Sequence, residues 1–106
     1  MRHLAAAELR SWLSTDPGSV TLLDVREPWE FALCSLEGSR HIPLGQLPVR
    51  ARELDPSRPT VVVCHHGVRS VHAGAFLERM GFGDVVNLRG GIDGWAREID
   101  PAMALY

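Results

Sequence analysis

The stretch TVVVCHHGVRS, residues 60–70, organises the rest of the chain. Its β-branched run at residues 60–63 predicts a buried strand. The apolar residues that follow recur at helical spacing and predict a helix: Val71, Ala75, Phe76 and Met80. Cys64–Ser70 is therefore expected to be the turn between a strand and a helix. A cysteine at the carboxyl end of a strand, facing a helix N-terminus, is in a position that favours reactivity.

The residues around Cys64 favour a negative charge on its sulfur. The first amides of a helix have no partner within the helix, so an anion placed there collects several N–H donors. Free cysteine titrates near ~8.5, and helix N-termini or nearby cations lower this to roughly 3.5–7.5, so we expect Cys64 to be ionised. Arg69 adds a permanent charge with forked donors suited to an oxyanion. Gly67 allows the loop to curl around the cysteine.

The loop resembles the active loop of rhodanese domains, the thiosulfate and persulfide sulfurtransferases, whose pattern is Cys-x-x-Gly-x-Arg followed by Ser or Thr. Three further segments resemble the family in the same order: LDVREPWEF at 23–31, GSRHIPL at 38–44 and GGIDGW at 90–95. The resemblance spans nearly the whole chain. It implies a single rhodanese-like domain over residues 1–106, with a central parallel sheet covered by helices on both faces.

The resemblance also implies an activity. A Cys64 thiolate would take the sulfane sulfur of thiosulfate or of a persulfide donor and become a persulfide. Cyanide, a thiol or a protein acceptor would then remove the sulfur, in two displacements and without a cofactor. His65, His66, Gly67, Val68, Arg69 and Ser70 are the predicted substrate-binding residues: their amides would hold the outer sulfur, Arg69 would orient the departing oxygens, and Ser70 would cap the next helix or donate to sulfur.

Two other places in the sequence bear on the site. Asp24 lies at the carboxyl end of a predicted strand and Arg26 follows that strand. We favour a structural ion pair or loop hydrogen bond that supports the site over a role in catalysis, and the family resemblance also implies the supporting role. Cys34-Ser35-Leu36 stands where the family commonly has Gly-His-Ile. Free cysteines are usually small buried apolar residues, so we expect this role for Cys34, with a sulfur-accepting or disulfide-forming thiol as the alternative.

The remaining pattern predicts strands alternating with helical segments, which favours an α/β fold with parallel strands. The expected elements are a helix at Leu4–Leu13, a strand at Val20–Val25, a short helix at Glu27–Leu33 with buried aromatics, an extended piece at Arg40–Leu44, helical turns at Gln46–Leu54, a strand at Val85–Leu88 and a last helix carrying Trp95 and Ile99. The Gly90-Gly91 turn lacks the spacing of a dinucleotide-binding fingerprint. The tail from Pro101 to Tyr106 carries weak signals.

Composition narrows the class of protein. The chain has 106 residues, 45% hydrophobic residues and a net charge of −2, which suits one globular domain and argues against a nucleic-acid surface. No apolar run approaches the ~20 residues of a membrane span, so we expect a cytoplasmic protein, a monomer or weak homodimer. All eleven basic residues are arginine, which excludes lysine Schiff bases and the Gly-Lys-Ser/Thr phosphate loop. Two cysteines are too few for a disulfide scaffold or a four-thiolate zinc site.

Three alternatives remain open from the sequence. His65 and His66 invite a metal, but a site would need two or more further ligands, and neighbouring loop residues usually point apart; no metal is expected. A cysteine phosphatase or arsenate reductase also uses a cysteine, a ring of amides and an arginine, but in a Cys-x5-Arg loop one residue longer than this one. A non-catalytic rhodanese-like module would bind or present a partner; such modules often lack the cysteine that this chain keeps.

Overall fold

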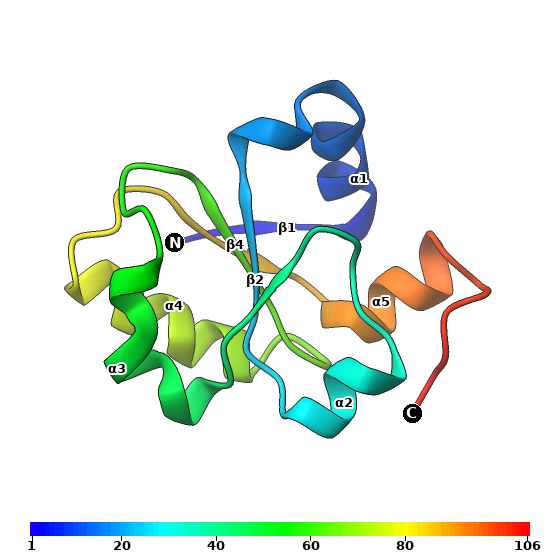
Figure 1. Ribbon diagram of the computed structural model, residues 1–106. Helices are drawn as coiled ribbons and strands as arrows, with labels where there is room; N and C mark the ends of the chain where they lie inside the picture. The colour runs from blue at the N-terminus through cyan, green and yellow to red at the C-terminus, as the bar shows by residue number, and fades with distance from the viewer.

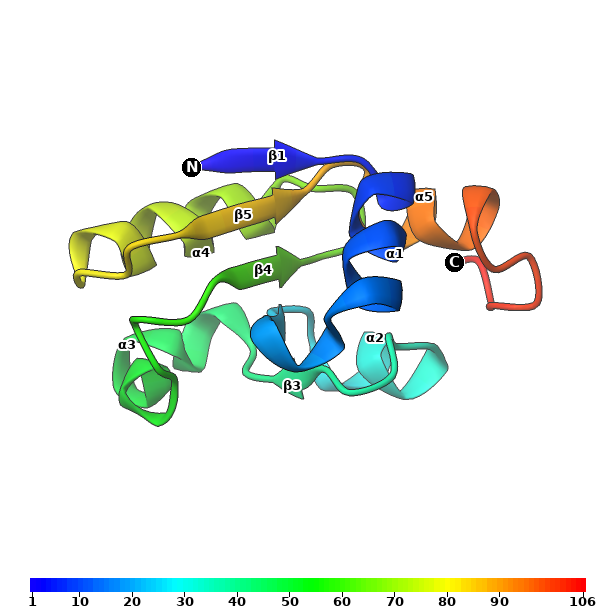
Figure 2. The ribbon, with the colours of Figure 1, turned by 90° about the horizontal axis from the view of Figure 1, so that it is seen from above.

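A five-stranded parallel sheet forms the centre of the molecule. The computed structural model describes residues 1–106. Its strands lie in the order β1-β5-β4-β2-β3, and every pair of neighbours is parallel. Figure 2 shows β1, β5 and β4 side by side. The strands are β1 at Arg2–Leu4, β2 at Thr21–Asp24, β3 at Arg40–His41, β4 at Thr60–Val63 and β5 at Val85–Leu88. This is the α/β architecture that the sequence predicts.

Helices cover both faces of the sheet. Figure 1 shows α3 and α4 on one side of the strands and α1 and α5 on the other. The α-helices are α1 at Ala6–Thr15, α2 at Pro28–Leu33, α3 at Leu47–Arg50, α4 at Arg69–Arg79 and α5 at Gly91–Glu98; single 3-10 turns occur at Pro17–Ser19, Leu44–Gln46 and Ala51–Glu53. None of these helices has the length and apolar character needed to cross a membrane.

Strand β4 divides its side chains between the two faces. Side chains alternate along a strand, so Val61 and Val63 belong to the core beneath α1 and α5, whereas Val62 belongs to the core beneath α3 and α4. Cys64 continues the alternation and joins the α3 and α4 side. The fully buried valines explain the uninterrupted apolar run, because a strand in the middle of a parallel sheet is covered on both faces.

The carboxyl ends of the central strands gather the polar residues that concern function. β4 lies between β2 and β5, with Asp24 opposite Val63 and Val62 opposite Asn87. In open α/β sheets, ligands bind beyond these carboxyl ends. Cys64 therefore leaves the sheet at the edge where Asp24 and Asn87 also lie.

The start of the chain differs from the expected helix over Leu4–Leu13. Residues Arg2–Leu4 form the edge strand β1, paired with β5, and helix α1 begins two residues later, at Ala6. A strand of three residues is too short to show the alternation by which strands are recognised. Gln46–Leu54, expected to be helical, consists of one turn of α-helix flanked by 3-10 turns.

Two apolar faces were also wrongly placed by periodicity. Helix α4 buries Ala73, Gly74 and Leu77, and leaves Val71 and Met80 exposed. Trp29, expected in the core, is 62% exposed. In α4, small residues face the sheet because β5 approaches closely: a Cβ on Gly74 would lie 3.1 Å from Val85. The buried residue of α2 is Glu30.

Candidate active site

Cys64 directly follows β4, at the start of a loop that leads into the first turn of α4. The first amides of α5 fix this loop from the side: Ile92 donates to the carbonyl of Cys64 at 2.8 Å, and Asp93 donates to the carbonyl of His65 at 3.0 Å. Gly91 makes this approach possible. Its φ is +61°, and a Cβ there would lie 2.5 Å from the carbonyl oxygen of Cys64. The glycine pair noted in the sequence thus supports the cysteine loop.

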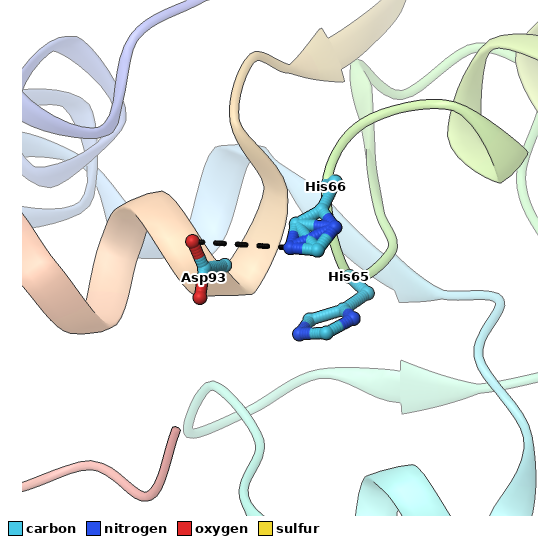
Figure 3. Close-up of side chains that lie close together, drawn as sticks. All are labelled: His65, His66 and Asp93. Carbon is cyan, nitrogen blue, oxygen red and sulfur yellow. Dashed lines mark ion pairs between the residues drawn. The ribbon is translucent and has the colours of Figure 1, made fainter. Parts of the chain in front are cut away.

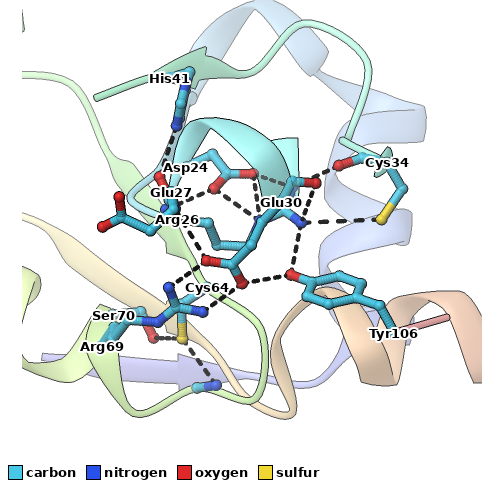
Figure 4. A network of polar contacts seen from close by, with 11 residues as sticks. Asp24, Arg26, Glu27, Glu30, Cys34, His41, Cys64, Arg69, Ser70 and Tyr106 are labelled. Atoms are coloured by element: carbon cyan, nitrogen blue, oxygen red, sulfur yellow. Dashed lines mark hydrogen bonds and ion pairs between the residues drawn. The ribbon is translucent and has the colours of Figure 1, made fainter. Parts of the chain in front are cut away.

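The sulfur of Cys64 has two polar partners (Figure 4). The amide of Gly67, whose φ of +101° suits glycine, donates to Sγ at 2.9 Å, and the thiol lies 3.3 Å from the hydroxyl of Ser70. Cys64 is 1% exposed, so the sulfur is covered by protein in this conformation. The three surface pockets are lined by other residues, and none reaches Cys64.

The expected ring of main-chain donors contributes a single hydrogen bond to Sγ itself. The other amides of the loop make no hydrogen bond within the protein: those of His65, His66, Val68, Arg69 and Ser70. An anion bound beyond Sγ would therefore not have to break existing hydrogen bonds to these amides. Free amides at the start of a helix are suited to hold such an anion.

Behind the sulfur, a chain of polar groups runs along the face of the sheet that α4 covers. The buried hydroxyl of Ser70 donates to Oδ1 of the buried Asn87, and Nδ2 of Asn87 lies 3.1 Å from Nδ1 of His3 on β1. Because the proton of Ser70 is directed to Asn87, the hydroxyl accepts from the thiol of Cys64. Ser70 is thereby fixed next to the sulfur.

Arg69, which the sequence assigned to an oxyanion of the substrate, binds a carboxylate of the protein. Its two terminal nitrogens donate to the two oxygens of Glu30 on α2, at 2.5 and 2.7 Å (Figure 4). Glu30 is 3% exposed, and its hydrogen bonds with Arg69 hold its pKa at about 2, well below its usual range. The same pairing raises the pKa of Arg69. The pair is thus fully charged at neutral pH.

The last residue, Tyr106, covers this pair and the loop. Its hydroxyl accepts from Arg26 at 2.9 Å and donates to Glu30 at 2.8 Å, and its ring stacks on His65 with centroids 3.8 Å apart. Burial is the main reason that the pKa of Tyr106 is raised, to about 12, and donation to Glu30 adds to it. The tail, which carries weak sequence signals, is therefore part of the site.

Asp24 and Arg26 form the buried ion pair that their sequence positions suggest, with 2.7 Å between the charged atoms. Arg26 also donates to the carbonyl of Cys34 at 2.6 Å and to its sulfur at 3.9 Å. Cys34 is half-buried and not in a disulfide. Arg26 thus ties β2 to the end of α2, which carries Glu30 toward Arg69.

His65 and His66 lie together instead of pointing apart. Their rings stack with centroids 3.9 Å apart, and Asp93 lies 3.9 Å from His66 (Figure 3). The ligand atoms of the three residues lie within 4.8 Å of one another. Stacked rings aim their nitrogen lone pairs side by side instead of at one point, and Asp93 is already bound by Arg97 at 2.9 Å. Burial, followed by the charge of His66, lowers the pKa of His65 and favours its neutral form.

Sequence reasoning missed three residues of the site: Glu30, Tyr106 and Asn87. Glu30 was read only as an acidic residue at a helix start, and Tyr106 as part of a tail. Asn87 offered one signal, since an amide within the apolar run Val85–Leu88 needs a buried partner. The other two meet Arg69 from segments distant in sequence, which no local spacing encodes.

Comparison with known proteins agrees with this architecture. Residues 5–98 match the family described as Rhodanese-like domain. A sulfurtransferase of Allochromatium vinosum is 39% identical over 89 residues, covering 84% of this chain and 83% of that protein. The thiosulfate sulfurtransferase GlpE of Pseudomonas aeruginosa is 40% identical over 81 residues, covering 76% and 73%. A crystal structure of a rhodanese-related protein from Thermoplasma volcanium superposes with a TM-score of 0.82 at 34% identity, covering 93% and 94%. The chain belongs to the rhodanese-like domain family.

Proposed function

We propose that this protein is a sulfurtransferase that carries sulfane sulfur as a persulfide on Cys64. The observation that carries the proposal is the position of Sγ at the end of β4, against the Gly67 amide and beside loop amides that have no other acceptor. Names of relatives support the activity at the level of the family. Thiosulfate, thiol persulfides and protein-bound persulfides are all donors that this chemistry accepts.

The reaction consists of two displacements. The Cys64 thiolate attacks the outer sulfur of thiosulfate; the new Sγ–S bond forms as the S–S bond of the donor breaks, and sulfite leaves with the bonding electron pair. An acceptor such as cyanide then attacks the outer sulfur and departs as thiocyanate, returning the electron pair to Sγ. No redox partner is needed, because the sulfane sulfur keeps its oxidation state throughout.

The loop supplies the stabilisation that this intermediate needs. A persulfide extends Sγ by one sulfur atom and places negative charge on it. Hydrogen bonds to charged groups contribute roughly 1.5–3 kcal/mol each, so even two of the unpaired loop amides would contribute substantially. The Ser70 hydroxyl, fixed by Asn87, lies 3.3 Å from Sγ and limits sterically where the sulfur can move while the outer sulfur is exchanged.

Access is a condition of the mechanism. Sγ is covered in this conformation, so a donor reaches it after side chains over the loop have moved. His66 and Val68 of the loop are exposed, whereas Arg69 is held by Glu30. The reaction of Cys64 with iodoacetamide should be slower in the native protein than in the unfolded chain, yet measurable.

The rival functions predict different chemistry. A cysteine phosphatase must fit a tetrahedral phosphoryl group, but the four residues between Cys64 and Arg69 make a shorter ring, which suits a single sulfur atom. A non-catalytic module would not retain sulfur. Hydrolysis of p-nitrophenyl phosphate without consumption of thiosulfate would favour the first rival, and inertness to every sulfur donor the second.

The decisive experiment is the intact mass of the protein before and after thiosulfate, and again after cyanide. The wild type should gain one sulfur atom and lose it to cyanide. Cys64→Ser should fold but gain no sulfur and form thiocyanate only at the background rate. Turnover above background in that variant would contradict the assignment of the nucleophile.

A further inference from the structure

The single arginine of the cysteine loop is already neutralised by a carboxylate. Arg69 is the cation that would meet the sulfonate oxygens of thiosulfate, but both of its terminal nitrogens are taken by Glu30. Arg69 remains 34% exposed, so the partnered guanidinium still faces the side from which a donor arrives. The donor therefore meets an ion pair instead of a free positive charge.

Hydrogen bonds to both carboxylate oxygens fix Glu30 in this position. Oε1 accepts from Arg69 and from the amide of Glu27 at 3.0 Å, while Oε2 accepts from Arg69 and from Tyr106 at 2.8 Å. With its pKa at about 2, the carboxylate keeps its charge at neutral pH. An incoming anion would have to displace a buried carboxylate that has four donors.

The site then distinguishes sulfur donors by their charge. Thiosulfate carries two negative charges and releases sulfite, a dianion, whereas a thiol persulfide carries at most one negative charge and releases a thiolate. Neutralising Arg69 removes more attraction from the first than from the second, because the interaction of a donor with a cation scales with the product of the charges. We propose that Glu30 is a specificity-determining residue, which occupies Arg69 and so selects thiol persulfide donors over thiosulfate. This inference rests on the proposed function.

The test compares two donors on one variant. Wild type and Glu30→Gln are treated with thiosulfate or with the persulfide of 2-mercaptoethanol, and the rate of Cys64 persulfide formation is followed by intact mass. The ratio of kcat/KM for thiosulfate to that for the persulfide should rise roughly tenfold in the variant, since one unit charge close to the donor is removed, and the change should lie in KM. Glu37→Gln, at an exposed position without an ion pair, removes the same charge elsewhere and should leave the ratio unchanged.

A second measurement needs no variant and holds if Glu30→Gln fails to fold. The KM of the wild type for thiosulfate should change little with ionic strength, whereas a free cation at the site would make it rise steeply with salt. A steep rise in the wild type, or an unchanged donor ratio in a folded Glu30→Gln, overturns the inference. Failure of the wild type to take sulfur from either donor overturns the proposed function instead.

Discussion

The two sides of the site are built in opposite ways. On one side, the loop 64–68 holds sulfur with a main-chain amide, a hydroxyl and further amides that have no acceptor. On the other, Arg69, Glu30 and Tyr106 form a network in which each polar group already has partners. The first side is ready to receive a ligand. In the second, the polar groups are paired with one another, and their charges set the electrostatic environment of the loop.

The loop depends on its backbone contacts with the start of α5, and disturbing them should produce the largest effect on stability. Gly91→Ala places a Cβ 2.5 Å from the carbonyl of Cys64 at a φ of +61°. Overpacking and a left-handed backbone together should cost about 2–5 kcal/mol, and the displaced loop should lose persulfide formation. Urea denaturation and intact mass measure the two effects. Gly83→Ala, at a glycine with nothing within 4 Å, is the matched control. If Gly91→Ala behaved like the control, α5 would not support the loop.

The charged network should be the side that fails in acid. The folded-state pKa of Glu30 is about 2, below its usual 4.5, so the carboxylate binds a proton less readily in the folded protein. Its contribution, about 3 kcal/mol, is present above pH 4.5 and is lost as the pH falls toward 2. Urea unfolding between pH 5 and pH 2 measures it, and Glu30→Gln should flatten this part of the profile. An equally steep profile in the variant would assign the acid sensitivity to other carboxylates.

Titration of Tyr106, the only tyrosine of the chain, also tests whether its side chain is covered as the structure shows. Burial raises its pKa to about 12, so tyrosinate absorbance should appear near pH 12 in the folded protein and near pH 10 in urea. Because the unfolded chain releases the proton first, folding stability falls as the pH rises from 10 to 12. A midpoint near 10 in the native state would show that the tail does not cover the site.

The same division explains what could be predicted from the sequence. The alternation of strands with helices and the spacing from Cys64 to Ser70 place the sulfur correctly, because a strand, a turn and a helix start are encoded in consecutive residues. The bond between Arg69 and Glu30 joins segments 39 residues apart, and Tyr106 lies 76 residues from Glu30. Local spacing contains no information on such pairs, so the sequence assigned Arg69 to an incoming oxyanion and indicated no partner for it within the protein. Val71 and Trp29 were misplaced for a related reason: burial depends on what packs above a residue.

The smallest effect is expected for a substitution of Cys34, a second thiol that contacts Arg26 of the charged network. Its sulfur lies 3.9 Å from Arg26, in the network, and Cys34 is the second free thiol of the chain. Arg26 is anchored by Asp24 and binds the carbonyl of Cys34, so these main-chain contacts survive the loss of the thiol. Cys34→Ser should therefore retain most sulfurtransferase activity, with a change in stability of about 1 kcal/mol or less, as is common for half-buried positions. Thiocyanate formation and urea denaturation, compared with Cys64→Ser, measure both. A large loss of activity in a folded Cys34→Ser protein would instead mean that sulfur passes from Cys64 to a second thiol, and that the network takes part in the transfer.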